Sequence, residues 1–292
     1  MGEPDDRLPR PRGRSRPRPR DPVVRLLTRE WGRDGHAKVV CWGGLNLSAH
    51  AHYDEAAPIL AQRFGLHVQA VEPPGWTSPP LAPEGYRPSS LAALLPPLLA
   101  PRGVFLGWSW GATIGAHLGA LGPETLAALV LLDAGYTDLQ DEPRFHERSL
   151  DELRDELQAA AVRFESWEAY LDAARARTRT WRPALEARAR AAMREEDGAV
   201  VPIVAPDTLA AGLHGVAVER PSAALGAVRC PLLLVVASET VAQLGEKPLE
   251  RFRAAVPRAE VITIDSSHDV LADALEPTLD AVGGFVTRIL AA

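Results

Sequence analysis

The residues best suited to chemistry form the motif Gly107-Trp108-Ser109-Trp110-Gly111, which has the pattern Gly-x-Ser-x-Gly. It lies between an apolar run at 103–106 and a stretch rich in small residues at 112–121, which predict a strand and a helix. In such a strained strand-to-helix turn the serine hydroxyl is exposed above the sheet, and the first amides of the helix point toward a developing oxyanion. The pattern predicts Ser109 as a nucleophile, against the alternative of an ordinary glycine-rich turn.

A serine hydroxyl is a poor nucleophile at neutral pH, so Ser109 requires a base and a group that orients this base. His268 is the predicted base, because it follows a late strand and the polar loop Asp265-Ser266-Ser267. The other histidines are interpreted as structural, although His50 and His52 are candidates for the lining of a pocket.

The elements that must position these residues alternate as strands and helices, which is typical of an α/β protein. Strands are predicted at 23–31, 37–42, 66–71, 103–106, 126–132, 231–237 and 259–264, with helices at 56–64, 112–121 and 276–290. From 136 to 224 the pattern predicts amphipathic helices, starting at Ser149, Ser166 and Pro183, and no buried strand. We therefore expect a sheet domain built from 23–135 and 225–292, and a helical cap at 136–224 that encloses the ligand site against it.

With these motifs the chain resembles the α/β-hydrolase fold family from about residue 23 to its end. Besides the serine motif, the resemblance is carried by Trp42-Gly43-Gly44, by Glu72-Pro73-Pro74-Gly75-Trp76-Thr77-Ser78 and by Ser267-His268-Asp269. The first looks like the family's His-Gly oxyanion segment with Trp42 for the histidine, and the second like its Asp-x-x-Gly-x-Gly-x-Ser turn with Glu72 for the aspartate. The resemblance implies a mostly parallel sheet flanked by helices, a carboxylesterase-like serine hydrolase, and His268 at the position of the catalytic histidine.

Two residues are candidates for the acid that the resemblance requires. In the family the acid usually follows the strand before the histidine strand, where Thr240 stands at the usual position and Glu239 one residue earlier. Some branches of the family instead place it after the strand that follows the serine motif, where this chain has Asp133. We favour Glu239, since its longer side chain can absorb the offset of one residue, and keep Asp133 as the alternative.

Stabilisation of a tetrahedral oxyanion needs two backbone donors, and the amides of Gly44 and Trp110 are predicted to supply them. Trp42, Leu45, Trp76 and Trp108 are predicted to line the substrate pocket with an apolar, aromatic wall. The alternative is that Trp108 and Trp110 pack beneath the serine turn as part of the core. No phosphate loop, dinucleotide fingerprint or metal-ligand spacing is found, so neither a cofactor nor a metal is expected.

Composition limits the remaining possibilities. Hydrophobic residues make up 46% of the 292 positions, enough for a large core, and a net charge of −6 argues against broad attraction to nucleic acid. Residues 1–22 contain seven arginines and six prolines and are predicted to be disordered. Because they contain no aromatic residue, we interpret them as a solvated extension rather than an RNA-binding arm.

Cys41 and Cys230 are interpreted as buried thiols in a reducing compartment. Since no apolar run has the length of a signal peptide or a membrane span, we expect a cytoplasmic protein without a membrane partner.

The sequence thus predicts a serine hydrolase that cleaves a carboxylic ester of a small apolar or aromatic molecule through an acyl-enzyme on Ser109. A thioesterase, lactonase or acyltransferase with the same triad is an alternative within this chemistry. From another class, a non-catalytic small-molecule receptor on the same fold is the second alternative, which the threonine at the usual acid position suggests.

Overall fold

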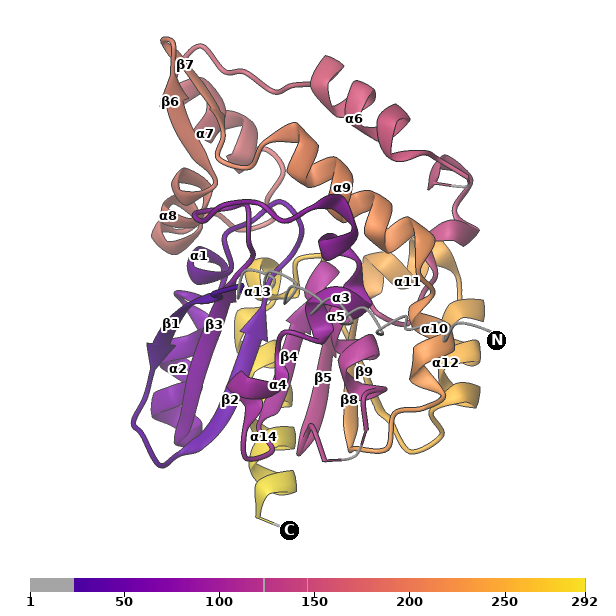
Figure 1. Cartoon of the computed structure of the whole chain (residues 1–292). Helices are drawn as coiled ribbons and strands as arrows, with labels where there is room; N and C mark the ends of the chain where they lie inside the picture. The colour runs from indigo at the N-terminus through magenta and orange to yellow at the C-terminus, as the bar shows by residue number, and fades with distance from the viewer. Residues whose placement is uncertain (1–23, 123, 146, 292) are drawn as a thin grey trace, which may run out of the picture.

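The computed structural model describes residues 24–122, 124–145 and 147–291, and the tail predicted for residues 1–22 lies outside them. Its main sheet contains β1 (Leu27–Trp31), β2 (Ala37–Trp42), β3 (Leu66–Glu72), β4 (Val104–Trp108), β5 (Ala128–Leu132), β8 (Leu232–Ala237) and β9 (Glu260–Ile264). The strands lie side by side in the order β1-β3-β2-β4-β5-β8-β9, and every neighbouring pair is parallel except β1 with β3 (Figure 1). This arrangement confirms the mostly parallel sheet predicted from the sequence.

The central strands are apolar throughout because both faces of the sheet are covered. All five residues of β4 and all five of β5 are buried. Successive side chains point to opposite faces, so Leu106 packs with one core and Phe105 with the other. The sheet therefore divides the interior into two hydrophobic layers.

Helices cover the two faces of the sheet. They are α1 (Ala49–Tyr53), α2 (Ala56–Phe64), α3 (Pro88–Ala92), α4 (Pro96–Leu99), α5 (Trp110–Gly119), α10 (Pro221–Leu225), α11 (Ser238–Leu244), α12 (Lys247–Ala255), α13 (Val270–Asp273) and α14 (Leu275–Leu290). Leu60 of α2 and Phe285 of α14 belong to one core, whereas Ile114 of α5 and Phe252 of α12 belong to the other. Each such buried side chain stabilises the fold by about 1.5–3 kcal/mol relative to an exposed position.

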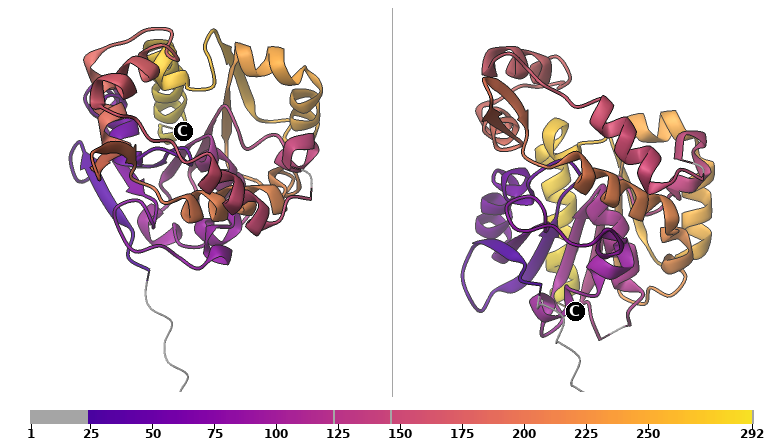
Figure 2. Two further views of the ribbon diagram at one scale, coloured as in Figure 1. Left: turned by 90° about the horizontal axis from the view of Figure 1, so that it is seen from above. Right: turned by 45° about the horizontal axis from the view of Figure 1, so that its top comes forward.

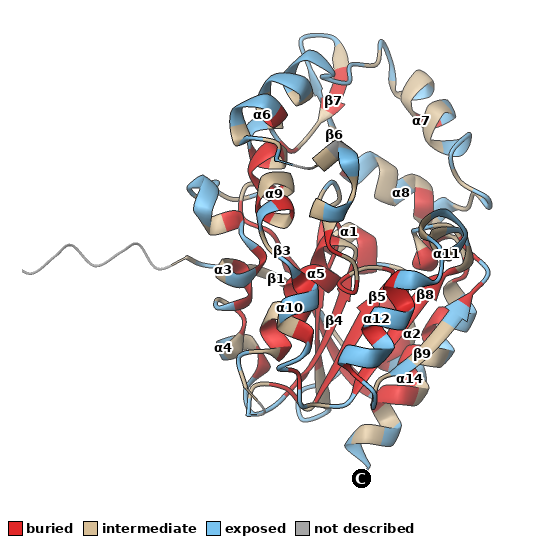
Figure 3. Cartoon of the chain, turned by 90° about the vertical axis from the view of Figure 1, so that its right-hand side faces the viewer, coloured by how far each residue is buried: buried red, intermediate tan, exposed pale blue. Residues whose placement is uncertain are grey.

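The residues between β5 and β8 form a distinct group of elements, and we call residues 136–224 the insert. It contains α6 (Leu150–Ala159), α7 (Trp167–Arg175), α8 (Pro183–Ala191), β6 (Met193–Glu196), β7 (Ala199–Pro202) and α9 (Pro206–Val218). Figure 1 and the right-hand view of Figure 2 place these elements together beyond one end of the sheet. Figure 3 shows α6 and α7 largely exposed, and Leu153 and Leu171 are their buried residues. The role of the insert as a cap stays a prediction.

One feature of the insert differs from the sequence-based expectation. No strand was predicted there, but β6 and β7 pair as an antiparallel hairpin. Its turn is Asp197-Gly198, and both residues have a positive φ, as a two-residue hairpin turn requires. The helix that follows Ser149 ends at Ala159, and Phe164 beyond it pairs with Val200 of β7.

No helix among the described residues combines the length and the apolar character that a transmembrane crossing requires.

Candidate active site

Ser109 occupies the turn between β4 and α5. Its backbone has φ 54° and ψ −115°, a conformation that costs a non-glycine residue about 1–3 kcal/mol. The turn is tight, because a Cβ atom on Gly107 would lie 2.2 Å from the carbonyl oxygen of Gly111. The Ser109 amide donates a hydrogen bond of 3.1 Å to the carbonyl of Leu132, which ties the turn to β5. The strained turn that the Gly-x-Ser-x-Gly motif predicted is therefore present.

His268 lies between the serine and a carboxylate. Its Nε2 is 2.9 Å from Ser109 Oγ, and its Nδ1 is 2.8 Å from Asp133 Oδ2. An ionised carboxylate can only accept a hydrogen bond, so this contact places the imidazole proton on Nδ1. Nε2 is then free to accept the proton of the Ser109 hydroxyl.

Asp133 follows the last residue of β5 and is 2% exposed. Besides His268, two groups donate to its carboxylate: the amide of Ala237 at 2.7 Å and the Thr240 hydroxyl at 2.6 Å. Three donors fix both oxygens, and the buried position keeps water away from them. Thr240 thus occupies the position at which an acid was expected. Its hydroxyl instead binds the acid Asp133, which follows the neighbouring strand β5.

Glu239, which the sequence analysis favoured as the acid, does not contact His268. Its carboxylate binds the guanidinium of Arg179 from the insert, and its side chain is 54% exposed. The physical reason is the start of α11 at Ser238, because consecutive residues of a helix point about 100° apart. Thr240 faces the site, so Glu239 faces away from it. The geometry brings Ser109, His268 and Asp133 together and leaves Glu239 out.

The predicted oxyanion donors lie beside the serine turn. Trp110 is the first residue of α5, and within the described residues neither its amide nor that of Gly44 donates a hydrogen bond. The Gly111 amide donates to the carbonyl of Gly43 at 3.0 Å, and the Trp108 ring packs against Gly44. These contacts hold the segment around Gly44 against the turn that carries Ser109.

A cavity of about 500 Å³ opens onto Ser109, Asp133 and His268. Its other lining residues come from the segment after β2, the start of α5, residues 134–145, α9 and α11: Leu45, Trp110, Thr113, Ala134, Tyr136, Thr137, Leu139, Glu142, Phe145, Leu213, Val216, Thr240, Gln243 and Leu244. Burial raises the pKa of Tyr136, and the charge of Asp133 acts in the same direction, so the phenol stays protonated. The cavity lining combines apolar side chains with hydroxyl, amide and carboxylate groups.

Of the four residues predicted to line this pocket, Leu45 does and the three tryptophans do not. Trp42 is fully buried and meets Trp110 edge-on, with ring centroids 5.8 Å apart, and Trp76 stacks on the same ring at 5.6 Å. Trp108 stacks on His52 in the other layer of the core. Trp42 and Trp108 end β2 and β4, so their side chains point to the faces of the sheet rather than beyond its edge. The core interpretation is correct for Trp108, and Trp110 is buried while also reaching the cavity.

The insert supplies a part of the lining that was not predicted from the sequence. Leu213 and Val216 of α9 face the cavity, together with Leu139 and Phe145. A usable signal was the spacing of Leu209, Leu213 and Val216, which follows the i, i+4, i+7 pattern of one helix face.

Among the described residues one group has the ligand types of a metal site. The side-chain ligand atoms of Glu30, Asp34 and His67 lie within 4.8 Å of one another at the antiparallel edge of the sheet. Glu30 already contacts His67 Nε2 at 3.1 Å and accepts from Gln69 at 2.6 Å, and both acids are exposed. Hydrogen bonding across the β1–β3 pair accounts for this cluster.

Comparison with known proteins adds information on the fold. No family model matches the chain, and no curated protein matches its sequence. Among solved structures, E-2-(acetamidomethylene)succinate hydrolase is similar with a TM-score of 0.73 and 22% identity, over 89% of this chain and 94% of that one. A thioesterase domain from the curacin biosynthetic pathway has a TM-score of 0.68 and 17% identity, over 91% and 95%. An esterase of M. tuberculosis has a TM-score of 0.61 and 21% identity, over 91% and 92%.

These similarities extend over about nine-tenths of the chain, and the similar structures are α/β-hydrolase proteins. The chain therefore has the α/β-hydrolase fold.

Proposed function

We propose that the protein is a serine hydrolase that cleaves a carboxylic ester through an acyl-enzyme on Ser109. The observation that carries the proposal is the hydrogen-bonded chain from Ser109 through His268 to Asp133, with distances of 2.9 and 2.8 Å. These three residues meet the geometric requirement for an activated nucleophile, its base and the group that orients the base.

In the proposed reaction, His268 Nε2 takes the hydroxyl proton of Ser109 as Oγ attacks the ester carbonyl. Asp133 stabilises the imidazolium that forms and keeps the ring in its orientation. The amides of Trp110 and Gly44 donate to the developing oxyanion, and His268 then returns the proton to the leaving alcohol. A water molecule activated by the same imidazole cleaves the acyl-enzyme and restores the free serine.

The chemistry of the cavity favours an uncharged acyl group. Leu139, Leu213, Val216 and Leu244 supply apolar contacts, and the volume of about 500 Å³ suits a small-molecule ester. The described lining residues include the carboxylates of Asp133 and Glu142 but no lysine or arginine. One similar structure is a hydrolase named for a succinate, which is a dicarboxylate, and the described residues that line this cavity offer no guanidinium or ammonium group to bind one. We also propose that the insert acts as a cap, because α9 forms part of the wall.

Thioesters remain a second substrate class, since the same geometry serves acyl transfer from sulfur and a thioesterase domain is among the similar structures. Lactones and acyl transfer to an alcohol use the same first step.

The test is to treat the purified full chain with a fluorophosphonate and to locate the adduct by mass spectrometry, with Ser109→Ala as the matched control. We expect a single adduct, on Ser109, and none in the variant. A panel of 4-nitrophenyl acetate, butyrate and octanoate, an acyl thioester and a lactone then identifies the acyl donor, and 4-nitrophenyl hydrogen succinate tests the charge preference. We expect the neutral butyrate to be cleaved with a higher kcat/KM than the succinate. Absence of both labelling and turnover in folded protein would favour a non-catalytic receptor.

A further inference from the structure

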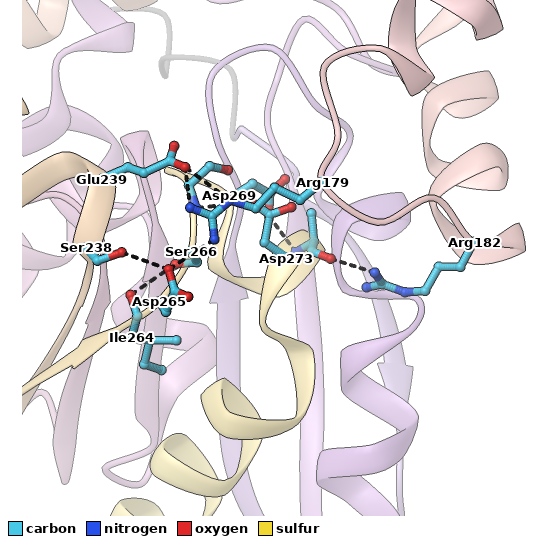
Figure 4. Close-up of polar contacts among 11 residues, drawn as sticks. Arg179, Arg182, Ser238, Glu239, Ile264, Asp265, Ser266, Asp269 and Asp273 are labelled. Atoms are coloured by element: carbon cyan, nitrogen blue, oxygen red, sulfur yellow. Dashed lines mark hydrogen bonds and ion pairs between the residues drawn. The ribbon is translucent and has the colours of Figure 1, made fainter.

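The loop that carries His268 is held by arginines of the insert. We call residues 265–273 the His268 loop; it joins β9 to α13 and includes that helix. Figure 4 shows Arg179 and Arg182 reaching this loop from the insert. Arg179 contacts Asp265 at 3.2 Å, and Arg182 donates to the carbonyls of Leu271 at 2.9 Å and Ala272 at 2.5 Å. Arg182 also forms a two-pronged ion pair with Glu55.

Arg188 makes the contact nearest to the base. Its NH2 group lies 2.5 Å from Oδ2 of Asp269, the residue that follows His268. The other oxygen of Asp269 accepts from the Ala272 amide at 3.0 Å and caps α13. Both side chains are mostly shielded, with 15% of Arg188 and 18% of Asp269 exposed. A charge-assisted hydrogen bond in this setting is stronger than a surface ion pair.

Arg188 also reaches His268 by a second route. Its NH1 group lies 3.2 Å from His52 Nδ1, and because arginine only donates, this nitrogen accepts and the ring is neutral. Burial lowers the pKa of His52 to about 3, which agrees with a neutral ring. The ring stacks on Trp108 with centroids 4.3 Å apart, and Trp108 Nε1 donates to the carbonyl of His268 at 2.9 Å.

The two routes end at neighbouring points of the chain next to the imidazole. One reaches the backbone carbonyl of His268 through His52 and Trp108, and the other reaches Asp269. The imidazole contacts Ser109 and Asp133, and its ring centroid lies 5.4 Å from that of Trp108. It is about half exposed, so its place also depends on the backbone that carries it.

We propose that Arg188 is a positioning residue for the base: it couples α8 of the insert to His268 and thereby keeps the imidazole aligned between Ser109 and Asp133. This inference rests on the proposed function. It predicts that the insert contributes to the chemical step from outside the cavity, since Arg188 does not line the site that holds the substrate.

The test compares Arg188→Met, Arg188→Lys and Asp269→Asn in the full chain, with Arg175→Met as the matched control. Arg175 is an exposed arginine of α7 whose partners, Asp172 and Glu186, belong to the insert itself. We expect Arg188→Met to lower kcat by about 10- to 100-fold, the loss of a hydrogen bond to a charged group, with KM changed by less than about threefold. Arg188→Lys keeps the charge beside Asp269 and should recover part of the rate, whereas Arg175→Met should stay within about twofold of the parent chain.

A second readout does not depend on activity. Hydrogen exchange of the peptide that covers 265–273, followed by mass spectrometry, should speed up in Arg188→Met and Asp269→Asn but not in Arg175→Met. The double variant Arg188→Met/Asp269→Asn should lose no more rate than the worse single variant, because both remove the same contact.

Unchanged kcat or unchanged exchange in Arg188→Met would overturn the proposal, and so would a rise in KM that accounts for the whole loss of rate. If Arg188→Met does not fold, Asp269→Asn decides by the same criteria. A parent chain that neither reacts with fluorophosphonate nor cleaves any ester refutes the proposed function instead, and the exchange experiment then decides the coupling alone.

Discussion

Replacing Asp133 with asparagine keeps the size of the side chain but leaves one oxygen to serve three donors. In the parent chain His268 Nδ1, the Ala237 amide and the Thr240 hydroxyl all donate to the carboxylate. If the new NH2 group faces His268, the ring must carry its proton on Nε2 and can no longer accept the proton of Ser109. If it faces Ala237 instead, a buried amide loses its acceptor.

The expected loss is large because Asp133 is 2% exposed and water cannot take its place. In serine hydrolase triads the same substitution lowers kcat by ~10⁴-fold, which corresponds to ~5.5 kcal/mol of transition-state stabilisation. Glu239→Gln is the matched control. The Glu239 side chain is 54% exposed, and its ion pair with Arg179 belongs to a class worth about 0–1 kcal/mol. Its turnover should stay within about threefold of the parent chain.

The assay is kcat and KM with 4-nitrophenyl butyrate at pH 8, with circular dichroism to verify that both variants are folded. Fluorophosphonate labelling gives the fraction of reactive serine independently of turnover. A loss of 10³-fold or more in Glu239→Gln, with Asp133→Asn within tenfold of the parent chain, would refute the assignment of Asp133. Equal mild effects of both substitutions would mean that neither carboxylate orients the base.

Two further predictions concern stability. Gly107→Ala should destabilise the fold by more than about 2 kcal/mol in denaturant unfolding, because the added Cβ would lie 2.2 Å from the Gly111 carbonyl oxygen. The control is Gly284→Ala in α14, where the added Cβ meets open space and should stabilise the fold by about 0.5–1 kcal/mol. Similar changes in the free energy of unfolding for both variants would contradict the close packing of the serine turn. Burial raises the pKa of Glu72, so the stability this group contributes is present below its unfolded pKa near 4.5 and is lost as pH rises through the folded value. The Tm of Glu72→Gln, measured by calorimetry, should therefore fall less between pH 5 and pH 8 than the Tm of the parent chain. If the Tm of the two proteins changes with pH in the same way, the pKa of Glu72 is not raised by burial.

The parts of the fold that local sequence determines were predicted closely. The structure places β2 at Ala37–Trp42 and α2 at Ala56–Phe64, the same limits as predicted. The run that forms β2 is apolar and ends at a glycine pair, a pattern that fits few structures other than a buried strand. The helix α2 ends at Gly65, which has the left-handed conformation that glycine favours. The serine motif is only partly local: Gly107 is required by its approach to Gly111, whereas Gly111 is required by the approach of the Trp42 carbonyl from β2.

The remaining features depend on side-chain direction, which the sequence does not contain. The choice between Glu239 and Asp133 depends on which side of α11 faces the site, and the position of Trp108 depends on which face of the sheet β4 presents. Residues 139–145 and α9 reach the cavity through long-range packing of the insert. The β6–β7 hairpin is different, because Asp197-Gly198 is a local turn signal from which this hairpin could have been predicted.

The register of β4 against β5 has a consequence for the order in which the site forms. Trp108 pairs with Leu132, so the next residues along the two strands, Ser109 and Asp133, lie side by side on adjacent strands. They belong to one strand–helix–strand unit, whose contacts are close in sequence, and we expect this unit to form early. His268 is 159 residues from Ser109, and the Ala237 and Thr240 groups that donate to Asp133 also come from the C-terminal part of the chain. We therefore expect a nascent chain to bring its nucleophile and acid together before it has a base or the donors that fix the acid, and to become reactive only as folding finishes.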